Sequence, residues 1–212
     1  MGGGPLTFSN PIRVGRQSAI RVFAHEYRDA TRPEQGSGEY DPGFMVTRLG
    51  AKINRALIAG TIDSSERRES ESGQSFRFNL IDVTGTHRVE VSPFNPELHP
   101  EAEEIHARFE RGDRFIMMVV GKQRSFTTED GGVFTSYNAQ EMREINRQIY
   151  AEWLAETADA TLRRIDAYEK ALNAEQSMAG FRGAGIPEDL VDGMLLSRAH
   201  YPDFESEVYM LD

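Results

Sequence analysis

The sequence contains no cysteine, only three lysines and no long apolar segment. Without cysteine the chain cannot form disulfides, use a thiolate nucleophile or bind zinc through sulfur, and this favours a cytoplasmic protein. The longest purely apolar run is Phe115 to Val120, far short of the roughly 20 residues that a membrane-spanning helix needs. With 212 residues, 39% of them apolar, the chain suits one domain with extensions or two small domains.

Acidic residues outnumber basic ones, and the net charge is −10. Such an excess disfavours contact with phosphate groups. However, residues 150–212 contain 13 acidic and 5 basic residues, whereas residues 1–149 contain 21 acidic and 19 basic residues. Most of the basic residues are arginines, which can pair with phosphate and also stack on bases. The N-terminal two thirds of the chain therefore remain compatible with nucleic-acid binding.

Short apolar segments separated by polar turns predict a β-barrel between residues 44 and 140. The expected strands are 56–62, 75–83, 87–94, 115–122 and 133–138, with a helix at 96–111 that ends at Gly112. Residues 64–73 are expected to form the first loop, and Gly60 suits the bend of a barrel strand. A helix between the third and fourth of five strands is the order of the OB fold. The predicted fold class is mainly β, a five-stranded OB-fold barrel with an N-terminal extension and a C-terminal helical extension.

Four regions are expected along the chain. They are an N-terminal extension at 1–43 that is partly loop, the OB-fold domain at 44–140, an amphipathic helix at 141–174 and an acidic helical tail at 175–212. Within the first region, residues 31–38 are expected to form a loop. The tail is expected to begin with a glycine-rich linker at 180–185, to continue with a short helix at 187–199, and to end in about a dozen loose residues.

Five short segments carry a resemblance to a known family. They are Arg21–Tyr27, Val46–Arg55, Asp82–Gly85, Gly121–Phe126 and Thr135–Tyr137. These segments are similar to those of archaeal OB-fold proteins associated with replication protein A, and the similarity extends from about residue 20 to near Ile165. The resemblance implies an OB fold, single-stranded-DNA binding or pairing with a replication protein A subunit, and a role in DNA replication and repair.

Eight residues are candidates for contact with single-stranded DNA. Aromatic side chains can stack on unpaired bases, and arginine or lysine can neutralise phosphates. The alternation of the second and third strands places Arg77, Asn79 and Arg88 on the face away from the core. Phe94 could stack on a base, or it could pack in the core or against a helix. One of the two aromatics beside the 127–132 loop is expected to be a core residue. The candidates are Arg77, Asn79, Arg88, Phe94, Lys122, Arg124, Phe126 and Phe134.

The apolar residues of the region 141–174 recur at mostly helical spacing. This surface could pack on the barrel of the same chain, or it could dock onto a replication protein A subunit. Docking would produce a homo- or hetero-oligomer. The candidate interface residues are Ile145, Ile149, Trp153, Leu162 and Ile165.

No arrangement of residues predicts an enzyme, a cofactor or a metal site. His99, Glu103 and His106 share a helical face, but a fourth ligand is missing and a solvent-exposed helix accounts for the pattern better. The sequence predicts a non-enzymatic accessory subunit that binds single-stranded DNA by aromatic stacking and arginine–phosphate contacts. The alternative is an assembly module whose barrel no longer binds DNA.

Overall fold

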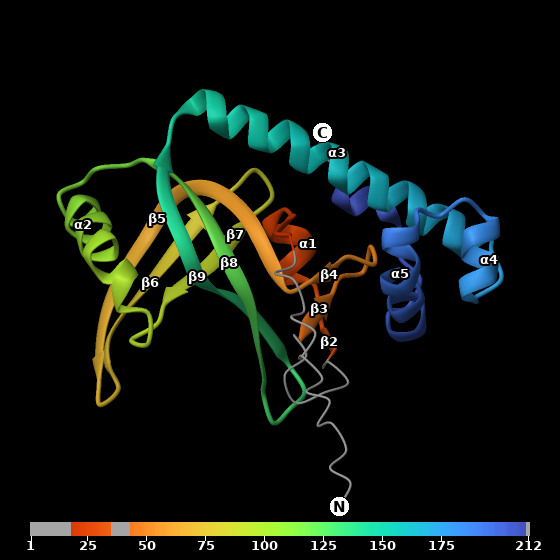
Figure 1. Ribbon diagram of the computed structural model, residues 1–212, viewed down its shortest axis with the longest axis horizontal. Coiled ribbons are helices and arrows are strands. Elements are labelled where there is room, and N and C mark those ends of the chain that lie inside the picture. Colours follow the sequence, from red (N-terminus) through yellow and green to blue (C-terminus); the bar gives the residue numbers. More distant parts are fainter. Residues whose placement is uncertain (1–17, 35–42, 211–212) are drawn as a thin grey trace, which may run out of the picture.

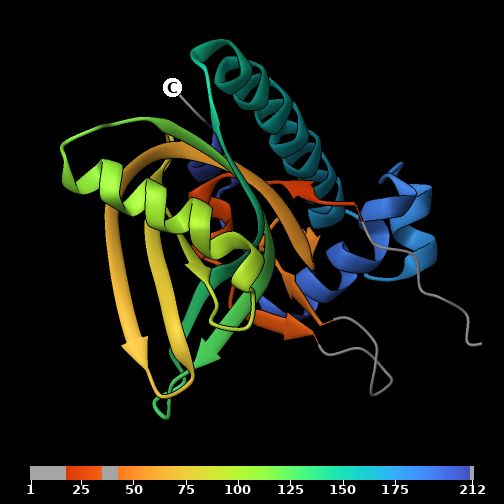
Figure 2. The ribbon, with the colours of Figure 1, turned by 60° about the vertical axis from the view of Figure 1, so that its left-hand side comes forward.

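Two long antiparallel hairpins dominate the computed structural model, which describes residues 18–34 and 43–210 (Figures 1 and 2). The first joins β5 (Arg55–Ser70) to β6 (Gly73–Ile81), and the second joins β8 (Ile116–Thr127) to β9 (Val133–Ile145). Strand β7 (Thr86–Val91) pairs antiparallel with β6 and parallel with β9, and β8 also pairs with β5. The pairings therefore lead from β5 through β6, β7, β9 and β8 back to β5, and we call this ring of strands the barrel.

The main sheet contains one strand more than the sequence predicts. Strand β1 (Ile20–Arg21), from the N-terminal extension, adds to β5 in parallel and makes the sheet six-stranded. Between β7 and β8 the chain forms the 3-10 helix η1 (Pro96–Leu98) and helix α2 (His99–Glu110). Gly112 follows α2 with a φ of 96°, the left-handed conformation expected after a helix end. The expected sheet-rich core with a helix before the fourth strand is confirmed.

The interior of the sheet follows the alternation in the sequence. Phe76, Phe78 and Leu80 are buried, and they meet Val89 and Val91 of β7 and Met117 and Val119 of β8 in one apolar core. A side chain at Gly60 would approach the carbonyl oxygen of Ile81 to 2.6 Å. Glycine is therefore required there so that two strands can approach closely, whereas the β-bulge itself lies between Ile62 and Ser64.

Both hairpins are longer than expected. Residues 64–70 continue β5 and do not form a loop, because their backbone pairs with β6 as far as Ser70 opposite Gly73. Similarly, β9 extends to Ile145, so residues 141–145 are strand and not helix. Helix α3 (Arg147–Leu172) begins after Asn146, whose side-chain oxygen accepts a hydrogen bond from the Ile149 N–H at 2.9 Å.

The N-terminal extension packs against the barrel. Helix α1 (Ala24–Arg28) follows β1, and a three-stranded sheet consists of β2 (Arg32–Glu34), β3 (Phe44–Val46) and β4 (Lys52–Ile53). Residues 32–34 are therefore strand where a loop was expected. Residues 35–38 of that predicted loop, together with residues 1–17 and 39–42 of the extension, lie outside the described residues.

The C-terminal region is a packed helical unit. Helix α3 crosses from the barrel to α4 (Met178–Gly183), α5 (Glu188–His200) and the 3-10 helix η2 (Ser206–Tyr209) (Figure 1). A second core joins α3 to Phe181, Val191 and Met194, and also includes Leu49 from the segment before β4. The expected linker at 180–185 is thus largely a helix with a buried phenylalanine, and residues 201–210, which were expected to be loose, are anchored by the buried Tyr201 and Tyr209. No helix in the described ranges is long and apolar enough to cross a membrane.

Candidate nucleic-acid interface

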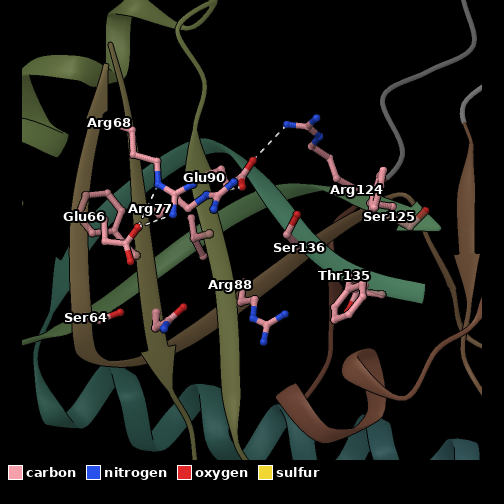
Figure 3. Close-up of a pocket in the computed structure, with 15 residues that line it drawn as sticks. Ser64, Glu66, Arg68, Arg77, Arg88, Glu90, Arg124, Ser125, Thr135 and Ser136 are labelled. Carbon is pink, nitrogen blue, oxygen red and sulfur yellow. Dashed lines mark hydrogen bonds and ion pairs between the residues drawn. The ribbon is translucent and has the colours of Figure 1, made fainter. Parts of the chain in front are cut away.

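A groove of about 500 Å³ runs over the outer surface of β6 and β7 toward the β8–β9 hairpin (Figure 3). We call it the arginine groove. It is lined by Ser64, Glu66, Arg68, Arg77, Phe78, Asn79, Arg88, Val89, Glu90, Arg124, Ser125, Phe126, Phe134, Thr135 and Ser136. Four of these residues are arginines and two are glutamates, so the groove itself is positively charged although the whole chain is acidic.

The alternation of β6 and β7 builds the floor of this groove. Asn79 lies opposite Arg88, and Arg77 lies opposite Glu90, in an antiparallel register that directs all four side chains to the same face. The residues between them, such as Phe78 and Val89, are buried in the barrel core. The positions of the polar side chains are therefore fixed by strands, and not by a flexible loop.

Ion pairs hold three of the four arginines (Figure 3). Glu90 accepts a hydrogen bond from Arg77 Nε at 2.8 Å and pairs with Arg124 Nη1 at 3.2 Å, while Glu66 pairs with Arg68 at 2.7 Å. The arginines are 48% to 57% exposed, and such surface pairs contribute only about 0 to 1 kcal/mol each. A phosphate group can therefore compete with these carboxylates for the guanidinium groups.

Arg88 differs from the other three. It has no ion pair or side-chain hydrogen bond within the described part of the chain, and it points away from the paired groups in Figure 3. Its guanidinium group is therefore available to a ligand without the loss of a contact to any described residue.

Two phenylalanines stand at the end of the β8–β9 hairpin. Phe126 and Phe134 are cross-strand partners, with 67% and 54% of their surfaces exposed. The expectation that one of them is a core residue is wrong. Large exposed aromatic side chains beside a positively charged groove can receive unstacked bases.

The groove contains six of the eight candidate DNA-binding residues. These are Arg77, Asn79, Arg88, Arg124, Phe126 and Phe134. Lys122 is exposed on β8 but does not line the groove. Phe94 also lies outside it, in the turn after β7, and is 84% exposed, which excludes the core alternative.

Several groove residues were not among the candidates. Arg68 falls within the loop expected at 64–73, and the structure places it on β5, where it pairs with Glu66. Glu90 could have been predicted from the sequence as a groove residue, because the alternation that exposes Arg88 also exposes the residue two positions later. No pattern in the sequence indicates that the hydroxyl groups of Ser64, Ser125 and Ser136 line the groove.

The candidate interface residues on and near α3 do not form one exposed surface. Trp153 and Ile165 are each 2% exposed and lie in the interior, and Ile145 belongs to β9. Only Ile149 and Leu162 are exposed, at 40% and 52%, and they are 13 residues apart, which places them on nearly opposite sides of a helix. The amphipathic surface expected at 141–174 thus packs within the chain.

The histidines of α2 make hydrogen bonds to nearby strands and loops. His106 Nδ1 lies 2.7 Å from the Ser65 hydroxyl, His99 Nε2 lies 3.0 Å from the Ser92 carbonyl, and Glu103 pairs with Arg67. Within residues 18–34 and 43–210, no group of three or more potential ligand side chains could hold a metal ion.

Comparisons with known proteins return weak structural similarities. No family model matches the chain, and no curated protein matches it. Among solved structures, the mitochondrial single-stranded DNA binding protein Rim1 of S. cerevisiae is 14% identical, with a TM-score of 0.32 over 43% of this chain and 95% of that one. A small single-stranded DNA binding protein from Mycoplasma pneumoniae is 13% identical, with a TM-score of 0.29 over 45% and 94%. The OBody NL8 bound to hen egg-white lysozyme gives 13% and 0.31 over 44% and 94%. TM-scores near 0.3 are too low to assign a function.

Proposed function

We propose that the ring of strands is an OB-fold barrel and that its arginine groove binds single-stranded DNA. The observation that carries the proposal is that two exposed phenylalanines of the β8–β9 hairpin line the same groove as four arginines, one each from β5, β6, β7 and β8. Stacking of bases on Phe126 and Phe134 contributes roughly 1 to 3 kcal/mol per base, and it does not depend on the base sequence of the DNA. Arginine contacts with phosphates give affinity that falls as the salt concentration rises.

Duplex DNA is a poorer ligand for this surface. Bases within a duplex are stacked on one another, and their faces are not accessible to Phe126 and Phe134. The groove has few unpaired cations, so it can neutralise only a few phosphates of either form. We therefore expect weak to moderate affinity, selective for single strands.

Phe94 and Lys122 extend the proposed DNA path beyond the groove. Phe94 follows β7, the strand that carries Arg88, and Lys122 lies two residues before Arg124 on β8. Both side chains are exposed. A strand longer than the groove could reach them, and we retain them as peripheral contacts.

Association with replication protein A, as an accessory subunit in replication and repair, is a further part of the proposal. It is supported by the sequence resemblance of residues 20–165. Because Trp153 is buried, a partner would have to bind a surface other than the buried side of α3.

Substitution of the hairpin phenylalanines tests the proposed function. We expect Phe126→Ala and Phe134→Ala each to weaken binding to a fluorescent oligo-dT by roughly 1 to 3 kcal/mol, measured by anisotropy. Leu172→Ala is the control, because Leu172 is also an exposed apolar residue, 39% exposed, but lies at the far end of α3. Unchanged affinity in both phenylalanine variants, with intact folding, would remove the hairpin from the site.

The second candidate function is an assembly module without DNA binding. It is favoured by the carboxylate of Glu90, which already neutralises part of the charge of Arg77 and Arg124. An oligo-dT titration at low salt decides between the two functions. An assembly module would show no binding even when electrostatic screening is weakest.

A further inference from the structure

A second pocket, of about 370 Å³, continues from the arginine groove. It lies between α1, the β6–β7 hairpin and the β8–β9 hairpin, and we call it the end pocket. The two cavities share Asn79, Arg88, Phe134 and Thr135. Four shared residues make the end pocket a continuation of the groove, so a single strand bound along the groove can enter it.

The unneutralised positive charge of the two cavities is concentrated in the end pocket. Arg28 of α1 and Arg88 of β7 both line it, and neither guanidinium group has an ion pair or hydrogen bond within the described residues. The described residues that line the end pocket include no Asp or Glu. In contrast, the other three arginines of the groove are paired with Glu66 or Glu90.

Helix α1 forms a fixed wall of the end pocket. The Tyr27 hydroxyl donates to the carbonyl oxygen of Ser136 at 2.9 Å, and the Thr135 hydroxyl donates to the carbonyl oxygen of Tyr27 at 3.4 Å. At its other end, the Ala24 N–H donates to Asp82 Oδ2 at 2.8 Å. The helix is thereby attached both to β9 and to the turn after β6, and a strand in the groove meets it on that side.

We infer that the end pocket binds the terminal phosphate of a single strand, an inference that rests on the proposed function. A terminal phosphomonoester carries a charge of about −1.5 to −2 at neutral pH, whereas an internal phosphodiester carries only one negative charge. Two arginines with no carboxylate partner in the described part of the chain match the larger charge, and guanidinium groups bind phosphate through paired hydrogen bonds. The exposed ring of Phe134 and the amide of Asn79 are positioned for the terminal nucleotide.

Binding of oligo-dT strands of equal length tests this inference. One strand carries a 5′-phosphate, one a 3′-phosphate, and one has hydroxyl groups at both ends. We expect one of the two phosphorylated strands to bind about tenfold more tightly than the hydroxyl strand, equivalent to one charge-assisted contact. Inorganic phosphate, which makes no contact with the groove, is expected to compete only at far higher concentration.

Arg28 is the residue to substitute, because it lines the end pocket and not the arginine groove. Arg28→Ala should abolish the preference for the phosphorylated strand and leave the affinity for the hydroxyl strand unchanged, and Arg28→Lys should restore part of the preference. Arg111→Ala is the matched control, since Arg111 is an exposed arginine just after α2 and outside both cavities. It should keep the full preference.

The outcomes separate this inference from the proposed function. Equal binding of all three strands by the unmodified protein would contradict the inference about the end pocket but not the proposed function. A preference for the phosphorylated strand that persists in the Arg28→Ala variant would mean that the terminal phosphate binds elsewhere, and it would also contradict this inference. Equally effective competition by inorganic phosphate would identify a general anion site instead of a strand end. If no strand binds, the proposed function fails and the end pocket fails with it.

Discussion

At the scale of single residues, the turn between β6 and β7 depends on a buried carboxylate. Asp82 Oδ1 accepts hydrogen bonds from the N–H groups of Thr84 and Gly85 and from the Thr84 hydroxyl. Its other oxygen accepts from the Ala24 N–H and lies 2.9 Å from His87 Nε2, and the side chains of Asp82 and His87 are both fully buried. Burial alone would raise the pKa of Asp82, but the hydrogen bond and charge of His87 and the backbone donors outweigh it, so the pKa lies below the ordinary 3.8.

We expect Asp82→Asn to destabilise the fold by about 3 to 5 kcal/mol, because it breaks a buried pair and presents an amide donor to other donors. A carboxylate whose pKa is lowered on folding stabilises the folded state above its unfolded pKa, and this stability is lost as the pH falls through the folded value. The unmodified protein should therefore lose this contribution below about pH 4, and the variant should lack that part of the acid dependence. Melting temperatures between pH 7 and pH 3 provide the measurement. Parallel acid profiles of the two proteins would contradict the assignment.

Glu90 neutralises part of the positive charge of the arginine groove, because its carboxylate pairs with Arg77 and Arg124. Glu90→Gln removes the carboxylate that holds Arg77 and Arg124, and we expect oligo-dT affinity to rise about fivefold, or roughly 1 kcal/mol, at low salt. Glu110→Gln is the control, since it makes the same change in net charge at the exposed end of α2. An equal increase in both variants would show a general charge effect and not a local one.

The arginine groove could be predicted in part from the sequence for a simple reason. In a strand with one buried side, alternation fixes which residues face outward, and this was sufficient for Arg77, Asn79 and Arg88. The partners of these residues could not be predicted. Glu90 and Arg124 are 34 residues apart along the chain, and whether they meet depends on the register of β7, β8 and β9. The same long-range register decides that Lys122 lies outside the groove.

At the scale of elements, α3 shows why an apolar pattern can mislead. Its buried side contains Trp153, Thr157, Thr161, Arg164 and Ile165, of which three are polar. The hydroxyl groups of Thr157 and Thr161 donate to the carbonyl oxygens four residues earlier, at 2.6 and 2.9 Å, so their burial leaves no unpaired donor. A search for apolar residues therefore selected Leu162, which is exposed, and missed the polar residues that face inward.

Trp153 distinguishes the two sides of α3. It packs edge-to-face on Phe23 with ring centroids 5.6 Å apart, and its Nε1 donates to the carbonyl oxygen of Leu57 at 3.0 Å. We expect Trp153→Ala to destabilise the protein by about 3 to 5 kcal/mol in urea denaturation followed by circular dichroism. Leu162→Asp should change stability by no more than about 0.5 kcal/mol. The opposite order would mean that Leu162, not Trp153, is the buried residue.

The lengths of the hairpins show a second limit of sequence patterns. Residues 64–70 are polar and charged, which is typical of a loop, yet they form strand because β6 supplies backbone partners along their whole length. Exposed ion pairs such as Arg68 with Glu66 accompany this solvent-facing ribbon. Strand length was therefore decided by pairing, which a local pattern does not contain, whereas the order of the elements could be predicted.

At the scale of the whole molecule, the barrel and the C-terminal helices are joined by contacts from the N-terminal half of the chain. Leu49 lies in the second core, and a side chain at Gly193 of α5 would approach the carbonyl oxygen of Gly50 to 2.0 Å, so the two backbones touch. Glu26 of α1 pairs with Arg164 of α3 at 2.6 Å, with both side chains at most 5% exposed. Since these contacts are buried, we expect the barrel and the helical unit to unfold together.

Arg164→Met tests this connection. The substitution leaves the Glu26 carboxylate buried with the Thr47 hydroxyl as its one remaining side-chain donor among the described residues, and we expect a loss of about 3 to 5 kcal/mol. Arg163→Met is the matched control, because Arg163 pairs with Asp189 at a surface position and should cost no more than about 1 kcal/mol. Trp153, the single tryptophan, reports on the contact between α3 and the barrel, whereas circular dichroism reports on all helices. In the unmodified protein the two signals should change at the same urea concentration. Separate transitions, or equal stability of the two variants, would mean that the helical unit folds independently of the barrel.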